Sequence, residues 1–165
     1  MRSGLAALLA GMAMLSAGSA SAAGTKAAAG ATFGDWQVEC EPEADGRSVC
    51  FLSQTQLLKE SNARLLKASV GYIGPKGEPA LVILLPLGID LRVGVSGQLD
   101  EGVTAPLQLQ QCLQEGCVAS RPLDARSLEA LLKAKVLKLK VTPHAGSQPL
   151  TLVVSLKGIT AGMGA

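Results

Sequence analysis

Beyond residue 32 the chain alternates between apolar and polar residues with a period of two, which is the pattern of half-buried strands. The alternation is clearest at 137–141, where leucine and valine alternate with lysine, and at 91–95, where apolar residues alternate with Arg92 and Gly94. The segment 80–85, ALVILL, is apolar throughout, which predicts a central strand covered on both faces. Further strands are predicted at 34–40, 47–57, 66–73, 106–112 and 149–156.

One segment has helical spacing instead. In ARSLEALLKA, Leu128, Leu131 and Leu132 share one face at spacings of three and four. Asp124 precedes this segment and is a suitable N-cap. Many short strands at intervals of about ten residues, with one short helix, predict an all-β fold, an antiparallel β-sandwich.

The first 22 residues have the pattern of a secretory signal peptide. Arg2 gives a positive start, the apolar run extends over 5–15, and Ala-Ser-Ala at 20–22 fits a small-x-small cleavage site. A membrane-spanning helix would need about 20 apolar residues. The first cysteine, Cys40, lies far beyond the apolar run, so it is not placed for lipoprotein acylation. The sequence therefore predicts cleavage and export.

Three parts of the chain are predicted on this basis. Residues 1–22 form the signal peptide, 23–32 a flexible leader without an apolar face, and 33–165 one β-sandwich domain. The chain is 48% hydrophobic and 17% charged, which argues against disorder. With aromatic residues at 2%, the core must consist of leucine, valine, isoleucine and alanine.

The four cysteines, an even number in an exported chain, are predicted to form disulfides. Four cysteines allow three connectivities, and loop-closure entropy does not select among them. Strand register favours local pairs. A three-residue loop with Gly46 left-handed would set Cys40 opposite Cys50, whereas a two-residue Asp45-Gly46 turn would set Cys40 opposite Phe51. Across the turn that contains Gly116, Cys112 would face Cys117. Two local disulfides are predicted.

Other chemistry has weaker support. The cysteine spacings do not suit zinc or a C-x-x-C redox centre, and the single histidine, His144, lies in a turn sequence. No metal or cofactor is predicted. A hydrolase would have to use acidic residues such as Asp90 and Asp100, which flank predicted strands. Nucleic acid is disfavoured because the chain has one Trp and one Tyr for base stacking.

Charge is uneven although the net charge is only +2. From residue 121 onward, seven basic residues accompany two acidic ones, Asp124 and Glu129. Such an excess could contact an anionic lipid or polysaccharide, a candidate peripheral contact with a membrane. Alternatively, the basic side chains are the solvated side of a strand and a helix and protect a sheet edge. The candidate contact residues are Arg121, Arg126, Lys133, Lys135, Lys138 and Lys140.

Several short motifs occur together in this chain, in order. They are FGDW at 33–36 followed by Cys40, CFLSQ at 50–54, LPLGI at 85–89, Gly116-Cys117, and SLKG at 155–158. With this order and spacing, the chain resembles the invasion-associated locus B family of Gram-negative bacteria from about residue 33 to the end. One departure is Ile159, where the family pattern expects an aromatic residue, which puts the end of the last strand in doubt.

The resemblance implies an immunoglobulin-like β-sandwich located in the periplasm or at the outer membrane, linked in some pathogens to entry into host cells. It implies no catalytic residues. The leading hypothesis is therefore a non-enzymatic protein that binds another envelope component or a host surface, with Trp36 in the core or over the first hairpin. The alternatives are an exported hydrolase and an envelope chaperone that lends a strand, which would need a long, unprotected sheet edge.

Overall fold

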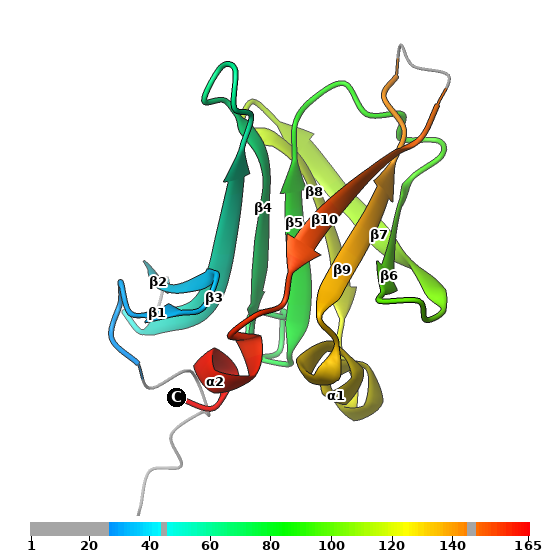
Figure 1. The fold of residues 1–165 in the computed structure, drawn as a ribbon. Coiled ribbons are helices and arrows are strands. Elements are labelled where there is room, and N and C mark those ends of the chain that lie inside the picture. The colour runs from blue at the N-terminus through cyan, green and yellow to red at the C-terminus, as the bar shows by residue number, and fades with distance from the viewer. Residues whose placement is uncertain (1–26, 44–45, 145–147) are drawn as a thin grey trace, which may run out of the picture.

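The computed structural model describes residues 27–43, 46–144 and 148–165. Ten antiparallel strands follow one another in the order β1-β2-β3-β4-β5-β8-β7-β6-β9-β10, and two short helices lie at one end (Figure 1). The predicted all-β class is thereby confirmed. The strands are β1 (Thr32–Phe33), β2 (Trp36–Pro42), β3 (Ser48–Leu57), β4 (Arg64–Gly71), β5 (Ala80–Leu85), β6 (Val95–Leu99), β7 (Thr104–Leu113), β8 (Gly116–Pro122), β9 (Val136–Val141) and β10 (Leu150–Ser155).

The sheet becomes a sandwich because β7 belongs to both layers. Its first part, from Thr104 to Leu107, pairs with β6, and its second part, from Gln108 to Leu113, pairs with β8. A register shift lies between Leu109 and Gln111, and such irregularities bend a strand. As a result β6, β9 and β10 fold over the layer that contains β4 and β5 (Figure 1). One hydrophobic core lies between the layers.

Alternation along the strands builds this core. In β4, Leu66, Ala68 and Val70 have no exposed surface, and they belong to one core cluster with Ile83 of β5 and Leu139 of β9. The segment 80–85 is a central strand between β4 and β8, as its apolar sequence predicts. The core is therefore aliphatic, with Trp36 as its one buried indole.

Both helices close the same end of the sandwich (Figure 1). Helix α1 (Ala125–Lys133) begins at the predicted N-cap, where a carboxylate oxygen of Asp124 accepts the N–H of Ser127 at 2.7 Å. Helix α2 (Ile159–Met163) follows β10, and the hydroxyl of Thr160 donates to the carbonyl of Leu132 at 2.7 Å. The sequence predicted only one helix, so α2 is a correction. Ile159, buried at 1% exposure, begins it.

The strand predicted at 91–95 is wrong. Residues 91–93 form a turn, Leu91 and Val93 are exposed, and β6 begins only at Val95. The cause is local hydrogen bonding: the Asp90 carboxylate accepts the N–H of Arg92 at 3.0 Å, and the N–H of Gly94 bonds to the carbonyl of Asp90. Asx-turns of this kind compete with strand formation.

Two further differences concern segments without a clear pattern. The sequence did not predict β8, whose inward side chains include the small residues Cys117 and Ala119. The described end of the predicted leader also lies against the domain, since Ala27 and Ala31 pack on the core and Thr32 belongs to β1. The predicted signal peptide, 1–22, lies outside the described residues.

Candidate functional site

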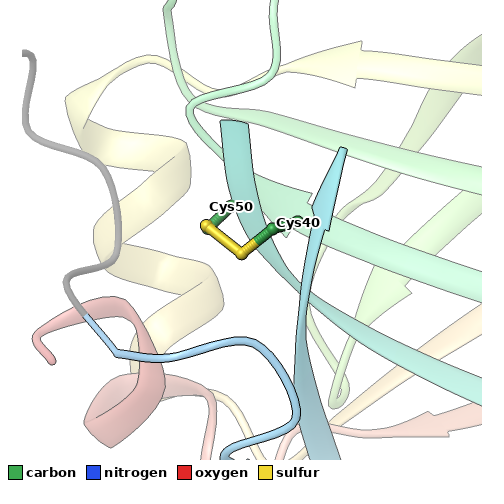
Figure 2. Close-up of a disulfide and its surroundings, with 2 residues drawn as sticks. All are labelled: Cys40 and Cys50. Carbon is green, nitrogen blue, oxygen red and sulfur yellow. A yellow bond between two sulfur atoms is a disulfide. The ribbon is translucent and has the colours of Figure 1, made fainter. Parts of the chain in front are cut away.

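The cysteines form the two local disulfides that strand register predicted. Cys40 of β2 is bonded to Cys50 of β3, and the two residues are cross-strand partners (Figure 2). Cys112 of β7 is bonded to Cys117 of β8 across a tight turn. No free cysteine remains in the part of the chain that the structure describes. The thiols are thus used for crosslinks, which constrain the unfolded chain by roughly 2 to 3 kcal/mol each.

The turns agree with the register argument. Gly46 has a φ of 82°, and the N–H of Glu43 bonds to the carbonyl of Arg47 at 2.8 Å, which closes the first hairpin. Ala44 and Asp45 of the predicted loop lie outside the described residues. In the second hairpin Gly116 has a φ of 141°. A Cβ there would approach the carbonyl oxygen of Leu85 to 2.1 Å, so this turn requires glycine.

The two acidic residues considered for hydrolysis have separate structural partners. The carboxylate of Asp90 accepts two hydrogen bonds from the Arg92 guanidinium, at 3.0 and 2.7 Å. The carboxylate of Asp100 lies at the other end of β6 and accepts the N–H groups of Lys135 and Val136 at 3.0 to 3.3 Å. Asp100 itself has a φ of 46°. Each carboxylate therefore fixes a turn or a connection.

Protonation of Asp90 is expected only at strongly acidic pH. The side chain of Arg92, followed by its backbone N–H, lowers the pKa of Asp90 from 3.8 to about 2. Because the folded pKa lies below the unfolded one, this contribution to stability is complete above about pH 4 and is lost as the pH falls toward 2.

In an NMR titration, Arg92→Gln should raise the pKa of Asp90 toward its ordinary value. The control Arg64→Gln should leave it unchanged, and equal values in wild type and R92Q would refute the pairing.

A third carboxylate, that of Glu39 on β2, lies on the outer face of the sheet. Lys67 Nζ and Ser53 Oγ each donate to it at 2.5 Å. Partial burial raises the pKa of Glu39, but these bonds outweigh it and leave the pKa below the ordinary value. The Lys67 ammonium also lies 5.8 Å from the Phe51 ring centroid. This cluster is an ion pair that ties β2 to β4 across β3.

The six candidate basic residues lie in two places. Arg121, Arg126 and Lys133 line a cavity between α1 and the β6–β7 hairpin. Lys138 and Lys140 alternate with the buried Leu137 and Leu139 and so point to the outer face of β9. Lys135 is exposed in the connection between α1 and β9. Strand β9 pairs with both β6 and β10, so its lysines do not protect a sheet edge.

The edge that needs protection is β10, and β3 covers it with side chains. The amide of Gln56 donates to the carbonyl of Val153 at 2.7 Å, and the amide of Gln54 donates to the carbonyl of Ser155 at 3.1 Å. Alternate residues of β3 thus satisfy alternate carbonyls of β10. The two layers are joined along this side by amide side chains instead of backbone pairing.

The motif residues at the two ends of the domain meet at the same place. The Trp36 indole N–H donates to the carbonyl of Ser155 at 3.0 Å, and the Ser155 hydroxyl donates to the Asp35 carboxylate at 2.6 Å. The Gln54 amide also donates to the carbonyl of Asp35 at 3.1 Å. We call this set, residues 33–36, Gln54 and 155–158, the terminal clasp. Trp36 is 1% exposed, so it lies in the core, the first of the two positions predicted for it, and the motifs have a structural role.

Two glycines allow the chains of the clasp to touch. Gly34 has a φ of 59°, and a Cβ on it would lie 2.4 Å from the carbonyl oxygen of Lys157. Gly158 has a φ of 94°, and a Cβ on it would lie 2.0 Å from the carbonyl oxygen of Phe33. The N–H of Asp35 bonds to the carbonyl of Lys157 at 3.0 Å. The sequence shows these motifs but gives no signal that they are in contact.

Three known proteins match between 78% and 97% of this chain. An invasion protein B homolog of Brucella abortus (strain 2308) is 31% identical over 160 residues, which cover 97% of this chain and 91% of the relative. Invasion protein B of Bartonella bacilliformis is 28% identical over 132 residues, 78% of this chain and 69% of the relative. The crystal structure of invasion associated protein b from Bartonella henselae matches with a TM-score of 0.69 at 27% identity, covering 81% of this chain and 91% of that chain. The profile of the invasion associated locus B (IalB) proteins matches residues 36–165, and the chain therefore belongs to the IalB family.

Proposed function

We propose that the protein is an exported, non-enzymatic component of the bacterial envelope that acts by contact with another envelope component or with a host surface. Three observations support this proposal: the signal-peptide pattern of residues 1–22, two disulfides, which are typical of oxidising compartments, and relatives named for invasion. Neither helix in the described ranges is long and apolar enough to cross a membrane.

The observation that carries the proposal is that the candidate acidic side chains are bound to other groups of the protein. Acid–base hydrolysis needs carboxylates that converge on one pocket and have separated pKa values. Here Asp90 is bound by Arg92, Glu39 by Lys67, and Asp100 by backbone N–H groups. These three carboxylates already hold structural partners, which favours a contact function over hydrolysis.

A strand-lending chaperone is less well supported. Strand addition needs an accessible row of backbone donors and acceptors at a sheet edge. The edge of β10 has its carbonyls at Val153 and Ser155 bound by Gln56, Gln54 and Trp36. At the other edge, β1 is only two residues long.

The outer face of β9 is the surface proposed for anionic contact. We expect the mature protein, residues 23–165, to capture species from envelope extract, and the variant K138E/K140E to lose them as the local charge reverses. The control K59E/K76E makes the same change in net charge at two exposed lysines elsewhere. Capture should weaken with salt.

Different results would count against this surface. If both variants lost capture equally, net charge would explain the contact and the proposed face would not. If K138E/K140E captured as much as wild type, these lysines would have no role in binding.

A further inference from the structure

The cavity between α1 and the β6–β7 hairpin has the properties of a small-ligand site. Its volume is about 590 Å³, within the roughly 300–1,000 Å³ that such sites occupy. It is mostly apolar, with core leucines at its base. The walls are formed by Leu99, Val103 and Ala105 on the hairpin side and by Ala130, Leu131 and Ala134 on the helix side.

Small and exposed residues keep this cavity open. Gly97 and Gly102 contribute no side chain, and Ala105 and Ala130 contribute one carbon each. A Cβ on Gly97 would come within 3.1 to 3.2 Å of Leu137 and Leu107, so the base is closely packed. At the hairpin, Val103 is 91% exposed. The apolar interior is therefore accessible from solvent.

The charges around the cavity are mostly positive. Arg121, Arg126 and Lys133 line it together with one acid, Asp100. The Asp100 oxygens accept N–H groups of the chain, and Lys133 is paired with Glu129 at 2.5 Å. Arg121 donates one long hydrogen bond, 3.3 Å, to the carbonyl of Pro106.

Of the four charged residues that line the cavity, Arg126 has the fewest polar contacts with neighbouring groups. It forms no hydrogen bond or ion pair with any residue in the described ranges. Hydrogen bonds from Ser127 are the main cause of the lowered pKa of Asp124, and the charges of Arg121 and Arg126 add to it. The Asp124 carboxylate is already bound to the N–H of Ser127 as the helix cap. Two guanidinium groups are thus available to an anion beside an apolar interior.

We infer that this cavity binds a single-chain anionic amphiphile, a long-chain fatty acid in its simplest form. The alkyl chain would occupy the apolar interior, and the carboxylate would bind Arg126 and Arg121, since guanidinium groups suit planar carboxylates. This site goes beyond the proposed function. It uses the interior of the domain and does not involve the outer face of β9, so each proposal can fail without the other.

Calorimetric titration of the mature protein with decanoate, dodecanoate and tetradecanoate, each below its micelle concentration, tests the inference. We expect saturable binding to one site, with the Kd tightening by about fourfold for each added methylene. Dodecanol, which lacks the charge, should bind about tenfold more weakly than dodecanoate. Absence of saturable binding, or a Kd that does not depend on chain length, would overturn the inference.

Matched variants locate the binding. Ala130→Trp places a large side chain in the cavity from an exposed helix position and should abolish binding, whereas Ala125→Trp, on the same helix but outside the lining, should not. Arg126→Glu should weaken binding by about tenfold, whereas Lys140→Glu should have no effect. Equal effects within either pair would place the amphiphile elsewhere and refute the site. The comparison of Arg126→Glu with Lys140→Glu remains informative even if the tryptophan variants fail to fold.

Discussion

Replacing Gly158 with alanine is expected to destabilise the domain by about 4 kcal/mol, which is among the largest effects of single substitutions. The alanine Cβ would lie 2.0 Å from the carbonyl oxygen and 2.4 Å from the carbonyl carbon of Phe33. Both atoms belong to the backbone and cannot rotate away, so β1 would have to separate from the end of β10. The φ of 94° adds a conformational cost for any residue with a Cβ.

Gly88→Ala is the matched control for this substitution. Gly88 has nearly the same φ, 92°, but a Cβ on it would meet no atom within 4 Å. It should therefore show the conformational cost alone, about 1–2 kcal/mol. Urea unfolding followed by circular dichroism measures both values. If the two variants lost equal stability, close contact in the terminal clasp would not be the cause.

Truncation of Trp36 to alanine is expected to lower the free energy of unfolding by about 3–5 kcal/mol, the second large effect. The side chain is 1% exposed and belongs to the main core cluster, so its removal leaves a cavity. Phenylalanine at this position should cost less, about 1–2 kcal/mol, because it restores most of the packing and loses the bond to Ser155. The carbonyl of Ser155 would keep the hydrogen bond from Gln54.

Leu91→Ala provides the comparison for Trp36→Ala. Leu91 is 54% exposed and lies in a turn, so its truncation should change stability by no more than about 0.5 kcal/mol. Circular dichroism is the appropriate signal, since Trp36 is the only tryptophan in the chain. A loss for Trp36→Ala as small as that for Leu91→Ala would contradict the core position of the indole.

Segments with strong local signals were predictable from the sequence. The strand at 80–85 has an apolar residue at every position, and α1 has a capping aspartate followed by leucines on one face. The disulfides were predictable because hairpin register sets Cys40 opposite Cys50 and Cys112 opposite Cys117. In each case residues close in sequence contain the needed information.

Segments with weak or competing signals were not predictable. At 91–95 the alternation of apolar residues suggested a strand, but the carboxylate of Asp90 and the left-handed Gly94, with a φ of 76°, produce a turn. Strand β8 buries small side chains, which give little contrast with polar neighbours. Helix α2 has only five residues, too few for a periodic pattern.

Contacts between distant residues account for the rest. The bond between Trp36 and Ser155 joins residues 119 positions apart, and nothing in either motif specifies the other as its partner. The cavity likewise depends on how the β6–β7 hairpin lies beside α1. Of the basic residues noted in the sequence, three reach this cavity because tertiary structure, and not their spacing, places them there.

The terminal clasp also sets an order of events during synthesis. The carbonyl that accepts the Trp36 indole N–H belongs to Ser155, and the carbonyl beside Gly34 belongs to Lys157. A nascent chain emerges N-terminal end first, so the Trp36 indole lacks its acceptor until Ser155 has been translated. The terminal clasp therefore forms only after the segment between its two halves, 37–154, has been synthesised.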